Sequence, residues 1–286
     1  MADTTLLSVC IITYNEEENL PRCLASVAFA DEIVVVDSLS TDRTVDIARQ
    51  AGCRVISQAF LGYVGQKNCA VRHAAYQWVL CLDADEWLRS GAAATIRAAL
   101  ATRTPDVAGY TLKRHTYYLG DWVNHGGWWP EHKLRLFDRQ RGQWCGNSLH
   151  EGVRVAGRVV SLDAEIGHRS YRDMAHHLSK LNTYTTLMAG GLHERGMAQV
   201  GLGTLVLRPL ARFCRMFVLR GGWKEGVRGM IIASIGAFYV FAKYAKLWEL
   251  QHGGPQAPEE GPNGPAPTQS RQGPRARPTA DTVAEE

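Results

Sequence analysis

Two carboxylates, Asp83 and Asp85, stand one residue apart directly after the apolar run WVLCL at residues 78–82. A strand at this place in an α/β fold ends at the ligand crevice, and the hard divalent cations that bridge phosphates prefer such oxygen ligands. We therefore interpret the pair as part of a metal and nucleotide site. The competing interpretation is a polar strand end in which Asp85 caps the next helix.

Further polar residues follow two earlier apolar runs. Asp37 ends the run at 32–37, and Asn15 and Glu16 follow the run at 6–13. A carboxylate at a strand end can accept hydrogen bonds from a sugar hydroxyl or a base N–H. Ordinary turn chemistry explains residues 40–42 well but explains Asp37 less well. No Gly-x-Gly-x-x-Gly follows the first run, which disfavours a dinucleotide site of the usual kind.

The elements that must position these residues alternate along the first 90 residues. The expected strands are 6–13, 32–37, 53–57 and 78–82, and the expected helices are 16–27, 40–50 and 65–75. Pro21 delays the regular part of the first helix to residue 19 or 20. This order predicts an α/β fold with a mainly parallel, doubly wound sheet and ligands at the carboxyl ends of its strands.

The charge of this 286-residue chain is unevenly distributed. Residues 1–168 contain 17 Lys or Arg against 19 Asp or Glu, whereas residues 169–250 contain 12 against 4. We predict one α/β domain at 1–168, made of two parts at 1–90 and 91–168. A basic amphipathic helical segment follows at 169–250. The Pro- and Gly-rich stretch 251–286 is predicted to be a disordered tail.

The basic segment alternates cations with apolar runs, which is typical of a helix lying in a membrane surface. Pro209 is expected to break or kink the stretch 202–224, so that its regular part begins only there. The longest apolar run, 229–242, has 14 residues, fewer than the roughly 20 of a spanning helix, which predicts a buried or interfacial helix. The alternative is a helical pair packed on the catalytic domain. The interleaved aliphatic runs disfavour nucleic acid as a partner.

Three motifs in order carry a resemblance: CIITYNEE at 10–17, IVVVDS at 33–38 and LDADE at 82–86. Together they resemble the family 2 glycosyltransferases, which are inverting enzymes of GT-A fold that use nucleotide-diphosphate sugars. The later motifs GQKN at 65–68, KLRLF at 133–137, LHE at 149–151 and IGH at 166–168 are similar to the branch of lipopolysaccharide and lipooligosaccharide core β-1,4-glucosyltransferases.

The resemblance implies that 1–168 is a catalytic domain with a nucleotide-sugar half at 1–90 and an acceptor half at 91–168. It also implies roles for individual residues. Thr13, Asn15 and Asp37 would border the uracil and ribose of a UDP-sugar, with Glu16 on the same rim. Asp83 would contact the nucleotide, and Asp85 would hold Mg²⁺ or Mn²⁺ on the diphosphate. Lys67 would neutralise a phosphate, unless it is a solvated surface charge. Leu39 departs from the family, which commonly has Gly there.

Glu151 is the candidate general base of an inverting transfer. Much of the family uses the Asp of a Glu-Asp pair, and this chain has His150 and Glu151 instead. His150 or His168 is a candidate to support the base or the metal, unless each is simply a satisfied polar residue. The alternative for Glu151 is a surface carboxylate.

Four residues are assigned to the acceptor: Trp128, Trp129, Arg135 and His150. Trp128 and Trp129 in the loop 122–130 suit the stacking of a sugar ring, although an aromatic cluster that seals a subdomain interface is equally compatible. Arg135 has the planar fork that suits an acceptor phosphate.

The sequence therefore predicts an inverting transferase that moves glucose from UDP-glucose to a heptose of the lipopolysaccharide inner core. Its expected acceptor is a lipid-linked core oligosaccharide. We therefore expect the enzyme to be cytoplasmic and bound peripherally to the inner face of the bacterial cytoplasmic membrane. Two alternatives stay open: transfer to polyprenyl phosphate or another polysaccharide acceptor, and a non-catalytic nucleotide-sugar-binding membrane scaffold. The scattered cysteines without Cys-x-x-Cys agree with a reducing compartment.

Overall fold

The fold is that of a computed structural model, which describes residues 5–147 and 150–253. The nucleotide-sugar half contains β1 (Leu7–Thr13), α1 (Leu20–Ser26), β2 (Glu32–Asp37), α2 (Thr44–Gln50), β3 (Arg54–Ser57), α3 (Gly62–His73), β4 (Trp78–Asp83) and β5 (Glu86–Leu88). The expected strands are confirmed to within one residue at each end. The first helix begins at Leu20, immediately before Pro21, as predicted.

The remaining elements fall into two groups. The acceptor half contains α4 (Ala92–Ala101), β6 (Val107–Tyr118), β7 (Asp121–Trp122), β8 (Glu131–Asp138), β9 (Gly142–Asn147), β10 (His150–Val155) and β11 (Arg158–His168). The helical segment contains α5 (Met174–Glu194), α6 (Leu202–Cys214), the π-helical turn η1 (Arg215–Leu219), the 3₁₀ turn η2 (Gly222–Glu225) and α7 (Gly226–Gln251).

One large sheet organises the catalytic half, in the order β3-β2-β1-β4-β8-β6-β11-β5 with β7 paired to β6. Strands β3, β2, β1 and β4 run parallel, as predicted. Beyond them β8 runs antiparallel to both β4 and β6. The whole sheet is thus mixed, and the expected parallel arrangement holds for its nucleotide-sugar side.

Strands β1, β2 and β4 are apolar along most of their length, as expected for parallel strands of a sheet that is covered on both faces. Val9 and Ile11 of β1 belong to a core cluster that also contains residues of α1 and α4. Cys10, between them, points to the opposite face and belongs to a second cluster with residues of α3. This alternation is the two-residue period of a strand, and it leaves the strand ends free to carry polar side chains.

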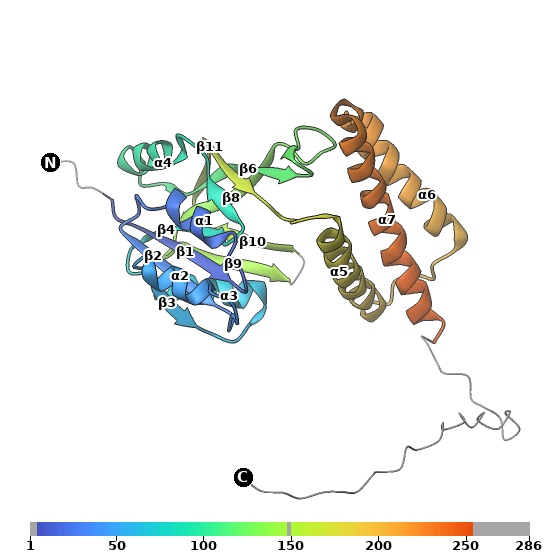
Figure 1. Cartoon of the computed structure of the whole chain (residues 1–286), viewed down its shortest axis with the longest axis horizontal. Helices are drawn as coiled ribbons and strands as arrows, with labels where there is room; N and C mark the ends of the chain where they lie inside the picture. Colours follow the sequence, from blue (N-terminus) through green and yellow to red (C-terminus); the bar gives the residue numbers. More distant parts are fainter. Residues whose placement is uncertain (1–4, 148–149, 254–286) are drawn as a thin grey trace, which may run out of the picture.

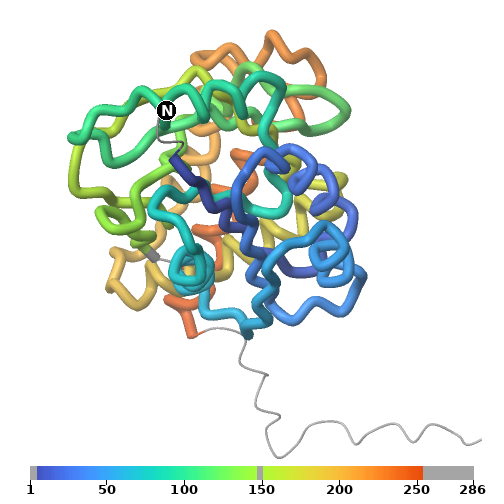
Figure 2. The backbone as a smooth tube through the Cα atoms, turned by 90° about the vertical axis from the view of Figure 1, so that its left-hand side faces the viewer, coloured from blue at the N-terminus to red at the C-terminus, as the bar shows by residue number. Residues whose placement is uncertain are grey.

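The helical segment lies to one side of the sheet, with α5 nearest the catalytic half and α6 beside α7 (Figure 1). Viewed at right angles, the catalytic half lies in front of these helices (Figure 2). All three helices are continuous. The predicted break at Pro209 is wrong, because α6 runs through it from residue 202 to 214.

The last apolar run belongs to a longer helical stretch than the sequence indicated. This stretch, Gly222–Gln251, consists of η2 and α7 and is long and apolar enough to cross a membrane by length and composition. Within its most apolar 18-residue window, 22% of the residues are buried. The predicted buried or interfacial position of the run stays a prediction. The proposed tail 251–286 lies outside the described residues from 254 onward, and its predicted disorder stays a prediction.

Candidate active site

The carboxyl ends of β1, β2 and β4 bring the predicted nucleotide residues to one edge of the sheet. Thr13 pairs in register with Asp37 on β2, and Ile12 pairs with Asp83 on β4. Thr13 and Asp37 are buried. Residues that stand up to 70 positions apart in the chain therefore share a single rim, because parallel strands end at the same side of a sheet.

The loops after β1 and β2 hold each other in place. Asn15 Oδ1 accepts a hydrogen bond from the Thr41 amide at 2.8 Å, and Ser40 Oγ accepts one from the Asn15 amide at 2.8 Å. Asp37 Oδ2 accepts from the Ser40 amide at 2.9 Å. Leu39 has a φ of 65°, the left-handed region that favours glycine. These contacts hold the turn in the shape for which the family commonly uses glycine.

Asp83 lies between two cations. Its Oδ1 is 2.9 Å from Lys67 Nζ, and its Oδ2 is 3.1 Å from an Arg135 guanidinium nitrogen. Burial alone would raise the pKa of Asp83, but Lys67 and Arg135 outweigh it and hold that pKa well below its usual range. Asp83 is therefore ionised at neutral pH, with its charge balanced by the protein.

Lys67 joins Asp83 to the candidate base. The same ammonium is 2.9 Å from Glu151 Oε1, and the lysine side chain is only 4% exposed. Asn68 joins α3, which carries Lys67, to β9, because its side chain forms two hydrogen bonds with the backbone of Trp144 on β9, at 2.9 and 3.0 Å. The hairpin β9–β10 thus places Glu151 beside the strand-end carboxylates, 84 residues after Lys67 in the chain.

Arg135 is a buried residue of this site. Its side chain is 4% exposed, and one guanidinium nitrogen contacts Glu86 Oε1 at 2.7 Å as well as Asp83. Glu86 is fully buried and also contacts Arg114 at 3.1 Å. These internal ion pairs hold Arg135 beside the strand end, and its expected contact with an acceptor phosphate stays a prediction.

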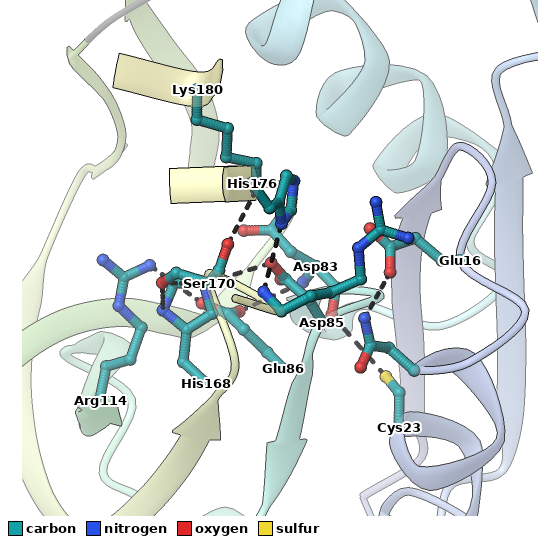
Figure 3. A network of polar contacts seen from close by, with 12 residues as sticks. Glu16, Cys23, Asp83, Asp85, Glu86, Arg114, His168, Ser170, His176 and Lys180 are labelled. Atoms are coloured by element: carbon teal, nitrogen blue, oxygen red, sulfur yellow. Dashed lines mark hydrogen bonds and ion pairs between the residues drawn. The ribbon is translucent and has the colours of Figure 1, made fainter. Parts of the chain in front are cut away.

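Asp85 points to the other side of the strand end, toward β11 (Figure 3). Its Oδ2 is 3.4 Å from His168 Nε2. Burial raises the pKa of Asp85, but His168 outweighs this and the net shift is downward. Glu16 lies close enough that Asp85, added to burial, raises the pKa of its carboxyl. Asp83 and Asp85 thus have different partners: fixed cations for the first and an imidazole for the second.

The two tryptophans assigned to the acceptor pack against the protein. The Trp129 ring stacks on His115 with centroids 4.1 Å apart, and the Trp128 ring lies parallel to that of Tyr118 at 6.0 Å. Both indoles stay half-buried. Their loop packs against the helical segment through His125, whose Nδ1 is 2.7 Å from Glu225 Oε1. The side chain of His150 lies outside the described residues.

Comparison with known proteins decides the family. The model of the family described as glycosyl transferase family 2 matches residues 8–157. The lipopolysaccharide core biosynthesis glycosyltransferase LpsC of Rhizobium meliloti is 31% identical over 85% of this chain and 92% of its own length. The chain is a family 2 glycosyltransferase. An uncharacterized glycosyltransferase of Rickettsia typhi is also 31% identical, over 85% of this chain and 87% of its own.

Among solved structures, the transferase is similar to the mannosyltransferase PcManGT of Pyrobaculum calidifontis in complex with GDP-Man and Mn²⁺. The TM-score is 0.49 at 15% identity, over 84% of this chain and 86% of that one. The predicted fold class, a GT-A α/β domain followed by a C-terminal helical segment, is confirmed by family and topology. The prediction of a glycosyltransferase is confirmed as well, which sets aside the non-catalytic scaffold.

The donor set of the transferase suits a divalent cation that is shared with a substrate. Within residues 5–147 and 150–253, no group of three or more His, Cys, Asp or Glu is arranged around a common point. Asp85 and His168 alone supply one carboxylate and one imidazole side by side. Mg²⁺ is commonly held by one or two carboxylates together with the phosphates of a substrate. The two side chains fit that pattern.

Sequence reasoning missed three parts of the site in the transferase. It did not assign Glu86, although the residue stands next to the quoted carboxylates and anchors Arg135. It did not connect Lys67 with Glu151, for which sequence spacing carries no signal. It also assigned α5 to the basic amphipathic segment and not to the site, although Lys180 on this helix lies close enough to Asp85 to help lower its pKa.

Proposed function

We propose that the chain is an inverting hexosyltransferase that moves glucose from UDP-glucose to a heptose of the lipopolysaccharide inner core. The observation that carries the proposal is the grouping of Asp83, Asp85 and Glu151 at one strand-end edge, with Lys67 between the first and the last. Similarity to LpsC, a lipopolysaccharide core biosynthesis enzyme by name, supports the acceptor class.

In this proposal the chain supplies a base on one side of the anomeric carbon and charge stabilisation on the other. Glu151 accepts the proton as the acceptor hydroxyl attacks the anomeric carbon, and the bond from that carbon to the diphosphate oxygen breaks. Lys67 orients Glu151 through Oε1 and leaves the second oxygen for the proton. A positioned base of this kind contributes roughly 10²–10⁴-fold.

Asp85 and His168 would hold Mg²⁺ or Mn²⁺, which when bound stabilises negative charge on the departing UDP. Asp83, Asp37, Thr13 and Asn15 would border the nucleotide. Because Lys67 and Arg135 already balance the charge of Asp83, it stays ionised and can accept hydrogen bonds from a ribose.

We further propose that the helical segment docks on the inner face of the cytoplasmic membrane. A helix on a soluble protein normally buries its apolar stripe, yet α6 has no buried residue. Exposed apolar residues and cations lie together on this part of the chain, and we call this set the docking surface. Its members are Leu202, Val206, Leu207, Leu210, Val218, Leu219, Trp223, Arg212, Arg215, Arg220 and Lys224. Mixed apolar and basic side chains are suited to an anionic bilayer.

The length of α7 supports a second acceptor. Polyprenyl phosphate stays a candidate because Gly222–Gln251 is long and apolar enough to enter a bilayer. In polyprenyl phosphate the atom that accepts the sugar is a phosphate oxygen, whereas in the inner core it is the oxygen of a sugar hydroxyl. The two candidates are therefore separated by the product each one forms.

The test is a transfer assay with a panel of UDP-sugars, a truncated core acceptor and polyprenyl phosphate, with and without Mg²⁺. We expect transfer from UDP-glucose to the core acceptor. Asp85→Asn should lower the rate roughly 10³-fold, since metal-assisted charge stabilisation contributes several kcal/mol. Glu151→Gln should lower it roughly 10²–10⁴-fold.

Asp163→Asn is the matched control, because Asp163 is 90% exposed and remote from these carboxylates. Near-normal transfer by Glu151→Gln would refute its role as the base. Transfer by the wild-type protein to polyprenyl phosphate alone would replace the core acceptor with the second candidate.

A further inference from the structure

Helix α5 turns one face toward the carboxylate site and the next face toward α7. His176, Lys180 and Tyr184 stand at four-residue steps and are all half-buried. The adjacent positions, which include Leu181 and Thr185, are buried. Lys246 on α7 donates a hydrogen bond to Thr185 Oγ1 at 2.9 Å. Packing on α7 therefore sets the rotation of α5 and directs the first row of side chains at the site.

This row lies beside the strand end. Lys180 Nζ donates to the Ser170 carbonyl at 3.0 Å, Ser170 Oγ is 3.1 Å from His168 Nε2, and that nitrogen is 3.4 Å from Asp85 Oδ2. Lys180 helps to lower the pKa of Asp85, after burial and His168, and it also acts against the burial that raises the pKa of Glu16. One turn further, Glu151 is among the groups that raise the pKa of Tyr184, after burial and Tyr63. Figure 3 shows Lys180 and His176 on the same side of the strand end as Asp85 and His168.

Three other cations of the site are already paired with carboxylates. Lys67 and Arg135 are each 4% exposed and bound to carboxylates, and Arg114 contacts Glu86 and Glu131. Lys180 differs. Its Nζ donates to the Ser170 carbonyl at 3.0 Å, and among the described residues no carboxylate lies within 4.0 Å of it. An ammonium has three donors, so Lys180 has two left for a ligand.

We propose that Lys180, flanked by His176, binds the diphosphate of the sugar donor. The assignment rests on the proposed function, in which the donor is a nucleoside-diphosphate sugar. When the bond to the anomeric carbon breaks, the electron pair stays on the diphosphate, and an ammonium beside it stabilises the added charge. Lys67, which the sequence suggested for this task, is instead a positioning residue for Asp83 and Glu151.

The experiment compares nucleotide binding by calorimetry, using UDP and uridine with the full chain, each with Mg²⁺ and with EDTA. Lys180→Met should raise the Kd for UDP roughly 10- to 100-fold, the range expected for losing a hydrogen bond to a charged group. The Kd for uridine, which lacks phosphate, should not change. Lys180→Arg should recover most of the UDP affinity because it keeps the charge.

Lys113→Met is the control, because Lys113 pairs with the exposed Asp163, and it should bind UDP like the wild type. An unchanged UDP affinity in Lys180→Met, with the wild type binding UDP, would overturn the assignment and leave the proposed function intact. Equal losses for UDP and uridine would also overturn it, since they indicate a general change in the site. Absence of UDP binding by the wild type would overturn the proposed function itself.

Discussion

The catalytic half and the helical segment treat their charges in opposite ways. In the catalytic half, Lys67 and Arg135 are nearly inaccessible and each contacts two carboxylates. In the helical segment, Arg212, Arg215 and Arg220 are exposed, and within the described part of the chain none of them lies within 4.0 Å of a carboxylate. Apolar side chains follow the same division, buried in the sheet and exposed along α6.

This difference in charge pairing follows from how much each region excludes water. Moving a charge out of water costs several kcal/mol unless partners compensate it, so the buried cations require their carboxylates. An exposed cation needs no partner in water and gains one only when it meets an anionic surface. The pattern of pairing therefore separates the part of the molecule that positions reacting groups from the part that is available to an external surface.

The largest expected effect on stability is in the paired region. Arg135→Met removes a buried guanidinium and leaves Asp83 and Glu86 with fewer partners, which should lower the free energy of unfolding by about 3–5 kcal/mol. Urea denaturation measures this change. Arg212→Ser on α6 should change the same quantity by no more than about 0.5 kcal/mol. Similar losses for the two variants would erase the contrast between the regions.

A smaller effect is expected at the docking surface. Replacing Arg212, Arg215 and Arg220 together by Ser should weaken binding to anionic vesicles roughly 100-fold, at about 1 kcal/mol for each cation. Sedimentation with phosphatidylglycerol vesicles measures it, and neutral vesicles should show little change. The matched control replaces the exposed Arg43, Arg49 and Arg54 of the catalytic half. An equal loss of vesicle binding in the control variant would mean that the net charge of the protein, and not the docking surface, determines binding.

The smallest effect concerns one of the contacts that join the two regions. The Tyr118 hydroxyl on β6 lies 2.7 Å from His177 Nδ1 on α5, within hydrogen-bond distance. Burial, with some help from His176 and Lys180, lowers the pKa of His177 to about 4. The unfolded chain takes up this proton near pH 6.5, before the folded chain does. The contribution of neutral His177 is thus complete above pH 6.5 and is lost as the pH falls toward 4.

We expect this loss to reach about 2 kcal/mol, obtained from unfolding free energies between pH 7 and pH 4. His177→Gln should flatten that part of the pH profile, whereas His193→Gln, at an exposed position of α5, should not. A profile that His177→Gln leaves unaltered would show that the buried imidazole does not titrate in this range.

The elements of the nucleotide-sugar half were predictable because their signals are local. Apolar, β-branched runs mark β1, β2 and β4, and parallel strands place Asp37 and Asp83 at one edge by topology alone. Contacts between distant elements carried no such signal. The bridge from Lys67 to Glu151 depends on how the β9–β10 hairpin packs on α3.

Features that the sequence did not predict, two in the helical segment and one at Arg135 in the acceptor half, also have a physical origin. A count of consecutive apolar residues stops at Lys243, although the backbone hydrogen bonds of α7 continue to Gln251. Pro209 lacks a backbone N–H, yet α6 stays helical around it. Arg135 has a guanidinium that suits phosphate, but its burial beside Glu86 depends on the pairing of β8 with β4, which its own neighbours in the chain do not specify.

The division of labour between the two regions is tested most directly by comparing transfer to a soluble, lipid-free core acceptor with transfer to the same acceptor embedded in anionic vesicles. The variant Arg212→Ser/Arg215→Ser/Arg220→Ser should keep the wild-type rate on the soluble acceptor and lose most of the rate on the embedded one. Asp85→Asn should lose both. A triple variant that fails equally on the soluble acceptor would contradict the account, because the helical segment would then be part of the reacting site.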